Sequence, residues 1–277
     1  MLRVAILNTG RCDLRHCQVM QDSMPSEEVA WDIVSPRDFE ASAIWNGLVV
    51  VGDTIEALSA AVTAHKNKTP VFQLHAGEKA QGHEYEDNRI RFAISQLAHV
   101  RFAPTEAAKE RLDKTYEPSR NVLAGAPAYY KVPEHPSWRN DHLGVLIYHH
   151  TDRASTPQVR EVVRSIGEKL GLVIRDFSSY WIPPDEFDTL MVNQTFIIGN
   201  SSAGMIEAAR WGVSAINIGY RQWGREPCSE RIVDTTLFTK PLLRAIEFAR
   251  DMDLKPGKNP YLPFNSALVY KSILAKL

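Results

Sequence analysis

Residues 196–226 read FIIGNSSAGMIEAARWGVSAINIGYRQWGRE, and this stretch decides the fold class. Its first four residues, FIIG, are typical of the end of a buried strand, and Met205–Trp211 has the composition of a helix that Gly212 closes. The apolar run Val213–Ile218 predicts a second strand. A strand, a helix and a strand in this order form the repeating unit of a parallel sheet.

The segment between the first strand and the helix is small and polar. It contains two hydroxyl side chains, Ser201 and Ser202, and the turn after the second strand carries Arg221 and Arg225. The free N–H groups of a first helical turn, together with the helix dipole, favour an anion at this position. Hydroxyl donors and arginines suit a diphosphate. The stretch therefore predicts a phosphate-bearing ligand at the carboxyl end of a parallel sheet.

Composition excludes several classes of protein. Of the 277 residues, 44% are hydrophobic and 23% are charged, as in ordinary globular proteins, and the net charge of -1 gives no overall basic surface for nucleic acid. No apolar run approaches the ~18 residues of a membrane span, and the first residues predict a strand better than a signal peptide. Cys12, Cys17 and Cys228 are too few for a disulfide framework or a four-ligand zinc site. We expect a cytoplasmic protein without a metal or cofactor.

Strands and helices alternate along the whole chain, which predicts an α/β fold with parallel sheets. The Pro-containing segment Lys131–Asp141 is the best linker candidate. We expect a first domain over residues 1–135, a second over 136–255, and a C-terminal helix within 256–277 that packs back on the first domain. Strands are predicted at 3–7, 28–34, 48–51, 71–74, 100–103, 121–124, 145–148, 172–174, 195–198 and 213–218, and further helices at 54–65, 87–99, 105–112, 156–170 and 184–191.

Polar clusters follow several of the predicted strands. Thr9–Asp13, Gly52-Asp53 and His75–Glu78 follow strands of the first half, and His149–Asp152 follows the first strand of the second half. Carboxyl ends of parallel strands meet at one edge of a sheet, so we expect these side chains to converge there. Two domains also predict a ligand site where they meet.

These motifs resemble the hydrolysing UDP-N-acetylglucosamine 2-epimerase family, in particular its sialic-acid-pathway branch. The resemblance implies two Rossmann-like domains facing across a cleft, as in the GT-B glycosyltransferases, with a nucleotide sugar between them. It also implies a homo-oligomer. The segment between Asp13 and Leu48 is short for this family, so we expect a shortened first domain. The resemblance lies in GNSSAGMIEA (199–208), INIGYRQWGRE (216–226), TGRCD (9–13), HAGE (75–78), IRFAISQLAH (90–99), AGAP (124–127) and NPY (259–261).

The resemblance also assigns roles to residues. Ser201 and Ser202 match serines that hold the diphosphate, with Gly204 in the same motif, and Glu207 matches a carboxylate on the ribose hydroxyls. The nucleotide-binding residues expected from the resemblance are Arg11, Ser201, Ser202, Gly204, Glu207 and Arg221. The expected catalytic residues are Asp53, Asp87, His75, His149 and Arg91.

The family's chemistry requires two ionisable groups. A base removes the C2 proton, an acid assists departure of the nucleotide diphosphate, and water then adds to the resulting glycal with inversion at C2. Among Asp53, Asp87, Glu78, His75 and His149, we expect Asp53 and Asp87 to be the acid/base pair. His149 and Arg221 would stabilise the departing diphosphate.

The chain departs from the family near the expected sugar. Thr54 stands where the family has an arginine, Asn88 where it has a second aspartate, and Phe92 where it has a histidine. With Asn88 in place of an acid, His75 or Glu84 would have to supply one proton transfer.

The sequence is also compatible with other functions. A glycosyltransferase or nucleotide-sugar hydrolase could use the same nucleotide pocket, and so could a non-catalytic nucleotide-sugar sensor. Several candidate residues also have ordinary structural explanations. Ser201 or Asp87 could cap a helix, Asp53 could be a turn residue, His75 could end a strand, and Glu207 could be a solvated charge.

Overall fold

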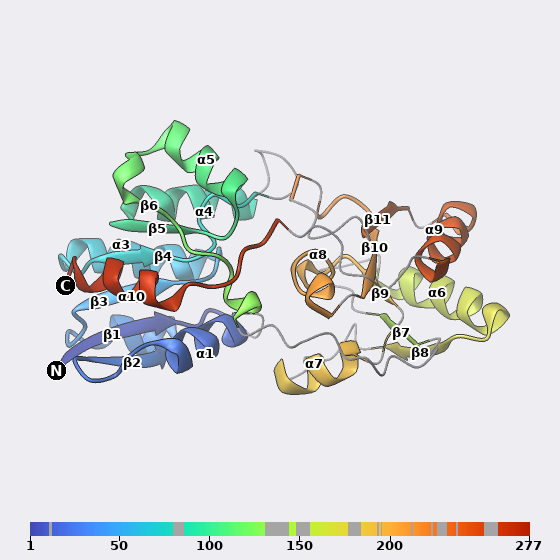
Figure 1. Cartoon of the computed structure of the whole chain (residues 1–277), viewed down its shortest axis with the longest axis horizontal. Helices are drawn as coiled ribbons and strands as arrows, with labels where there is room; N and C mark the ends of the chain where they lie inside the picture. Colours follow the sequence, from blue (N-terminus) through green and yellow to red (C-terminus); the bar gives the residue numbers. More distant parts are fainter. Residues whose placement is uncertain are drawn as a thin grey trace. The chain divides into compact units, whose positions relative to one another are not determined.

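The computed structural model describes residues 1–10, 13–79, 86–130, 144–147, 156–176, 184–192, 194, 196–211, 213–222, 224–225, 232–236, 238–251 and 260–277. The chain divides into two compact units. The first comprises Met1–Lys131 together with Tyr261–Leu277, and the second comprises Val132–Pro260. Each unit contains its own parallel sheet (Figure 1).

The sheet of the first unit contains all six strands predicted for the first half of the chain. They pair in the order β2-β1-β3-β4-β5-β6, and every described pairing is parallel. Successive strands are added on one side of β1 up to β2 and on its other side from β3 onward, so the strand order reverses between β1 and β3. Ligands of such sheets bind at the carboxyl ends of the strands next to this point. The strands are β1 (Leu2–Leu7), β2 (Val29–Val34), β3 (Gly47–Val50), β4 (Val71–Gln73), β5 (Val100–Ala103) and β6 (Asn121–Leu123).

Helices cover both faces of this sheet because successive side chains of its strands point to opposite faces. Val4 and Ile6 pack with α1 (Leu14–Ser23) and α10 (Ser266–Leu274) on one face. Ala5 and Leu7 pack with the helices of the other face. These are α2 (Pro36–Glu40), α3 (Ile55–Lys66) and α4 (Glu86–Leu97).

Helix starts in this unit follow sequence signals. Thr105 Oγ1 accepts a hydrogen bond from the Ala108 N–H at 3.0 Å and is the N-cap of α5 (Glu106–Thr115), which corresponds to the helix predicted at 105–112. The short helix α2 was not predicted, although Ser35 caps it and Pro36 occupies its first position, a common signature of a helix start.

The C-terminal segment belongs to the first unit. Val269 and Ile273 of α10 are fully buried in the same hydrophobic cluster as β1 and β3. Figure 1 shows α10, in red, among the elements formed by the first half of the chain. The core of this unit is therefore completed by residues that follow the second unit in the sequence.

The second unit contains a five-stranded parallel sheet in the order β11-β10-β9-β7-β8. Its strands are β7 (Gly144–Ile147), β8 (Val173–Asp176), β9 (Phe196–Gly199), β10 (Ser214–Ile218) and β11 (Ile232–Thr235). The edge strand β11 was not predicted. Its four residues are only partly buried or exposed, so it lacks the apolar run that marks a buried strand.

Helices cover both faces of the second sheet as well. Phe196 and Ile198 pack with α6 (Thr156–Leu170) and α9 (Thr239–Asp251) on one face. Ile197 and Ala215 pack with α7 (Pro184–Val192) on the other. None of the helices that the structure describes is both long and apolar enough to cross a membrane.

The helix predicted at Met205–Trp211 differs in the structure. An α-helix, α8, runs over Ser202–Ile206, and a 3₁₀-helix follows over Ala208–Trp211. The helix begins earlier because Ser201 caps it, accepting a hydrogen bond from the Ala203 N–H at 3.3 Å. The small residues after Ser201 are therefore part of the helix and pack directly on the sheet.

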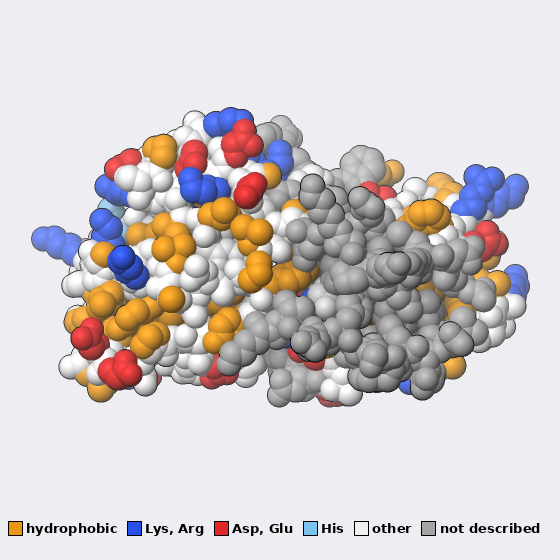
Figure 2. Space-filling view, viewed as in Figure 1, with side chains coloured by type: hydrophobic (Ala, Val, Ile, Leu, Met, Phe, Trp, Pro, Cys, Tyr) orange, Lys and Arg blue, Asp and Glu red, His pale blue; other side chains and the backbone are white. Residues whose placement is uncertain are grey.

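Charges of both signs are interspersed on the surface of the first unit. On α5, Lys109 pairs with Asp113 and Lys114 pairs with Glu110 at the i,i+4 spacing. Figure 2 shows this mixture of blue and red side chains at the top of the view, where α5 lies. The described part of this helix therefore presents no basic surface.

Candidate functional site

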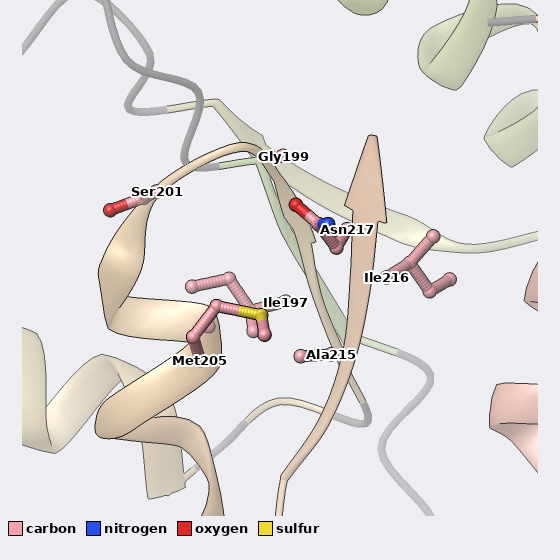
Figure 3. A pocket seen from close by; sticks show the side chains of 8 residues that line it. Ile197, Gly199, Ser201, Met205, Ala215, Ile216 and Asn217 are labelled. Carbon is pink, nitrogen blue, oxygen red and sulfur yellow. The ribbon is translucent and has the colours of Figure 1, made fainter. Parts of the chain in front are cut away.

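In the second unit, the Ser201 loop lies at the carboxyl end of the sheet. Asn200 and Ser201 directly follow β9, and a small pocket opens beside them. Figure 3 shows Ser201 at the turn into α8, with Met205 on that helix and Asn217 on β10. The pocket is lined by Ile197, Gly199, Ser201, Gly204, Met205, Ala215, Ile216 and Asn217.

The turn after β10 is fixed onto this loop by side chains. Arg221 Nη1 donates to the main-chain oxygen of Asn200 at 3.0 Å, and Gln222 Nε2 donates to the same oxygen at 2.8 Å. Gln222 also accepts a hydrogen bond from Arg225 Nε at 3.0 Å. The structure thus places Arg221 on the main chain of Asn200, the residue before Ser201, while the role of Arg221 and Ser201 in binding stays a prediction.

Gln222 was not predicted as a site residue. It is 2% exposed and its amide joins Asn200 to Arg225. A polar side chain buried this deeply needs hydrogen-bond partners, so Gln222 holds the two turns in a fixed relation. The only signal in the sequence is its place between two arginines of a turn.

Other residues predicted for nucleotide binding have visible structural roles. Gly204 lies within α8, where an added Cβ would be 3.5 Å from the Cβ of Ala215, so the helix packs closely on β10. Glu207 is partly buried and follows α8 as its C-cap residue. Ser201 is also the N-cap of α8, so its ordinary structural explanation holds beside the functional one.

In the first unit, a carboxylate cluster follows β1 and β3, the two strands between which the strand order reverses. Thr9 Oγ1 donates to Asp13 Oδ2 at 2.5 Å. Gly52, after β3, packs against both side chains: an added Cβ would lie 2.5 Å from Thr9 Oγ1 and 2.6 Å from Asp13 Oδ2. A larger residue at this position would displace both side chains, and the next residue is Asp53.

Asp53 forms an ion pair with Arg91 of α4, whose side chain is buried. Arg91 Nη1 also donates to the main-chain oxygen of Glu78 at 3.2 Å and to Asn88 Oδ1 at 3.3 Å. The structure therefore brings two predicted catalytic residues, Asp53 and Arg91, together. Asn88 is fully buried and helps to hold Arg91.

Asp13 has an unusual electrostatic environment. Burial raises its pKa to about 6, and the neighbouring Asp53 charge adds to this increase. The Thr9 hydrogen bond and the charges of His75 and Arg91 act in the opposite direction. Asp13 can therefore exchange a proton near neutral pH, which makes it a site candidate. The sequence placed it in a polar cluster after the first strand but assigned it no catalytic or binding role.

A second cluster lies after β4. His75 Nδ1 is 3.3 Å from Glu78 Oε2, and Tyr261 donates its hydroxyl to Glu78 Oε1 at 2.7 Å. All three side chains are buried. His75 has a left-handed backbone conformation, with φ of 52°, which is uncommon outside glycine and often found at functional sites.

His16 of α1 contacts this cluster from the side, with its ring centroid 4.7 Å from that of His75. Burial holds the pKa of His16 well below its usual value, and the charges of His75 and Arg15 act in the same direction, while Glu78 opposes them. His16 is therefore neutral at physiological pH. Among the described residues, no group of three or more His, Cys, Asp or Glu side chains is placed to hold a metal ion.

Several predicted residues lie outside the described part of the chain. These are Arg11, His149, the alternative acid Glu84, the helix-closing Gly212, and the cysteines Cys12 and Cys228. Asp87 lies in α4, but its side chain is not among those described. Their predicted roles stay predictions.

The two parallel α/β units, with polar residues at the carboxyl ends of their strands, define a two-domain protein of the Rossmann-like, GT-B-like class. The family model described as UDP-N-acetylglucosamine 2-epimerase matches residues 45–142. The fold class and the resemblance to hydrolysing UDP-N-acetylglucosamine 2-epimerases, both predicted from the sequence, are confirmed.

Similar proteins include two curated bacterial enzymes. The UDP-N,N'-diacetylbacillosamine 2-epimerase (hydrolyzing) of Legionella pneumophila is 27% identical over 269 residues, which cover 83% of this chain and 70% of that protein. The UDP-N-acetylglucosamine 2-epimerase of Neisseria meningitidis serogroup B is 25% identical over 240 residues, which cover 73% of this chain and 63% of that protein.

The fold also matches solved structures. The UDP-GlcNAc 2-epimerase of Methanocaldococcus jannaschii, in complex with UDP-GlcNAc and UDP, superposes with a TM-score of 0.82. The match covers 99% of each chain at 16% sequence identity. At this identity the similarity establishes the fold and nothing finer.

Proposed function

We propose that the protein is a hydrolysing UDP-sugar 2-epimerase that converts UDP-N-acetylglucosamine into N-acetylmannosamine and UDP. The similarity to named 2-epimerases supports this reaction class. The observation that carries the proposal is the group of ionisable side chains in the first unit. Asp53 pairs with Arg91, Asp13 packs against Gly52 directly before Asp53, and His75 and Glu78 lie at the next strand end.

The reaction requires proton transfer in both of its steps. A base takes the C2 proton while the C1–O bond to UDP breaks, which leaves a 1,2-unsaturated sugar. Water then adds its oxygen to C1, and C2 receives a proton on the opposite face. We assign Asp53 and Asp87 as the acid/base pair, with Arg91 holding the Asp53 side chain in place through their ion pair.

His75 is the best candidate for the proton transfer that Asn88 cannot perform. The Asn88 amide oxygen accepts a hydrogen bond from Arg91, and an amide does not titrate in the physiological range. His75 lies beside the Glu78 carboxylate, with Nδ1 3.3 Å from Oε2, so its ring orientation is defined by a charged neighbour. An imidazole in this setting is suited to act as a general acid.

We assign UDP binding to the second unit. Ser201, Ser202 and Arg221 would contact the diphosphate, and Glu207 the ribose hydroxyls. The hydrogen bond from Arg221 to the Asn200 carbonyl supports this assignment because it places the guanidinium at the serine loop. Arg11 and His149 would complete the phosphate contacts, and Gly204 would belong to the same serine motif at the start of α8.

We also propose that the enzyme is a cytoplasmic homo-oligomer that acts in amino-sugar metabolism of the sialic-acid type. Residues 1–135 would form the catalytic domain and residues 136–255 the nucleotide domain. Light scattering coupled to gel filtration tests the oligomeric state, since a mass near 31.2 kDa would indicate a monomer.

A glycosyltransferase or nucleotide-sugar hydrolase is the second candidate. Thr54 and Asn88 favour it, because the family that the sequence resembles has charged side chains at these two positions. In this structure Thr54 caps α3 and Asn88 accepts a hydrogen bond from Arg91. A non-catalytic sensor is less compatible with the structure. Burying the Arg91 charge opposite Asp53 costs free energy, and a simple binding protein has less need of it.

Proton NMR of UDP-N-acetylglucosamine in deuterated water tests the proposal directly. We expect free N-acetylmannosamine with deuterium at C2, together with UDP. The same assay with UDP-N,N'-diacetylbacillosamine tests the sugar named for the Legionella relative. If neither sugar is converted but saturation transfer reaches the uracil protons, nucleotide binding stands and the epimerase assignment is wrong.

A further inference from the structure

We propose that Tyr261 is a positioning residue for the Glu78 carboxylate and that the segment returning from the second unit supplies it. This inference rests on the proposed function because it assigns Glu78 a part in the acid/base cluster. Tyr261 is the first residue of the chain that belongs again to the first unit. Its hydroxyl therefore reaches a carboxylate 183 positions earlier in the sequence.

The geometry divides the two oxygens of Glu78 between two partners. Tyr261 donates to Oε1 at 2.7 Å, while Oε2 faces His75 Nδ1 at 3.3 Å. Glu78 is 5% exposed and Tyr261 is 3% exposed, so water does not compete for this bond. A hydroxyl fixed on one oxygen holds the carboxylate plane and keeps the other oxygen directed at His75.

Other charged and titratable groups surround the cluster. Arg91 donates to the main-chain oxygen of Glu78, and Arg111 donates to that of Gly77 at 2.8 Å. His16 lies against His75, and Arg15 is buried next to it in the sequence. The two arginine contacts hold the main chain of the turn, and Tyr261 holds the Glu78 side chain.

The ring of Tyr261 is itself held in place. It stacks on Tyr129 with a centroid distance of 6.0 Å and an interplanar angle of 4°. The next residue, Leu262, forms main-chain hydrogen bonds with Ala126 and with Pro104. The ring of the tyrosine and the residue after it are thus attached to the first unit, which leaves its hydroxyl little freedom.

Gly125 allows the returning segment to approach this closely. Its φ is +76°, and an added Cβ would lie 2.1 Å from the main-chain oxygen of Pro263. Only glycine is compatible with both the backbone conformation and the contact. The position of Tyr261 is therefore fixed by packing, as expected for a residue that orients another side chain.

The test is Tyr261→Phe, which keeps the stacked ring and removes only the hydroxyl. Without this donor the charged form of Glu78 is less favoured, so the limb of the pH–rate profile that reports Glu78 moves to higher pH by about one unit. We expect kcat to fall about tenfold at the wild-type optimum with KM nearly unchanged.

Tyr270→Phe is the matched control, since Tyr270 lies in the same C-terminal segment and packs on Trp31 instead of the cluster. It should keep the wild-type kcat and pH profile. An active Tyr261→Phe enzyme with an unchanged pH profile would overturn the proposal and leave the proposed function standing.

A second readout does not depend on turnover. The ¹⁵N resonances of the His75 ring report its titration. Without the tyrosine hydroxyl, the negative charge of Glu78 is no longer shared with Tyr261 and interacts more strongly with the imidazole. We expect the titration midpoint of His75 to rise in Tyr261→Phe and to stay in place in Tyr270→Phe. If wild-type protein turns over no UDP-sugar, the proposed function fails, and this titration still decides whether Tyr261 orients Glu78.

Discussion

At the scale of single residues, the candidate chemistry depends on a few buried charges. Asp53 is predicted from its place after a buried strand, and the structure adds that Arg91 is its ion-pair partner. Asp13 gains its unusual proton affinity from burial and from Asp53, neither of which a sequence motif displays. The motif thus predicts where the candidate site lies, while the raised pKa of Asp13 follows from packing.

Asp53→Asn should lower kcat by at least about 100-fold, because it removes a proposed acid/base group. It also leaves the buried Arg91 without its charged partner, so we expect a lower thermal unfolding midpoint. Steady-state kinetics and calorimetry measure the two effects. Asp32→Asn is the control, since it removes a carboxylate from the more exposed pair with Arg3 and should change both quantities little.

Asp13 predicts a pH dependence of stability. Its pKa in the folded protein is about 6, raised from 3.8, so between these values the folded state binds more protons than the unfolded state. Stability contributed by this group therefore falls as the pH rises from about 4 to 6, by up to about 3 kcal/mol.

Asp13→Asn removes this titration. Compared with wild type, the variant should gain free energy of unfolding at pH 7.5 relative to pH 4, as measured by urea denaturation at both pH values. An equal difference between the two proteins at both pH values would contradict the assignment.

At the scale of elements, turns at the carboxyl ends of strands bring the nucleotide-binding candidates together. The turn after β10 is fixed to the turn after β9 by Arg221 and Gln222, which share one carbonyl oxygen. The sequence predicts both strands and the arginine. It does not predict that α8 is only five residues long, since the break before the 3₁₀-helix depends on how the segment packs on the sheet.

Arg221→Ala should raise the Kd for UDP by about 10- to 100-fold, because charge-assisted hydrogen bonds to phosphate are among the stronger polar contacts. Isothermal titration calorimetry with UDP measures the change. Arg244→Ala removes an exposed arginine from α9 in the same unit and should bind UDP like the wild type. Equal affinities of the two variants would exclude Arg221 from the nucleotide site.

At the scale of the whole molecule, the chain leaves the first unit after Lys131 and returns to it at Tyr261. The return adds α10 to the core and Tyr261 to the Glu78 cluster. Stability of the first unit and geometry of its candidate site therefore depend on the same C-terminal segment.

Gly125→Ala should lower the thermal unfolding midpoint by several degrees. The substitution forces a Cβ into the Pro263 carbonyl at a left-handed position, so the returning segment must shift. Gly171→Ala is the matched control, because Gly171 also has a positive φ of 66° but an added Cβ there meets nothing within 4 Å. The difference between the variants isolates the contact with the returning segment, and equal midpoints would show that this contact contributes little.

The sequence by itself determined the class of the fold, because apolar runs of strand length alternating with helical segments leave few arrangements other than parallel sheets. It also located the polar strand ends, including Asp53, His75 and Ser201. Only the tertiary structure decided which of these residues meet. The Asp53–Arg91 pair and the bond from Tyr261 to Glu78 join residues 38 and 183 positions apart, and such pairings arise from packing that no local pattern encodes.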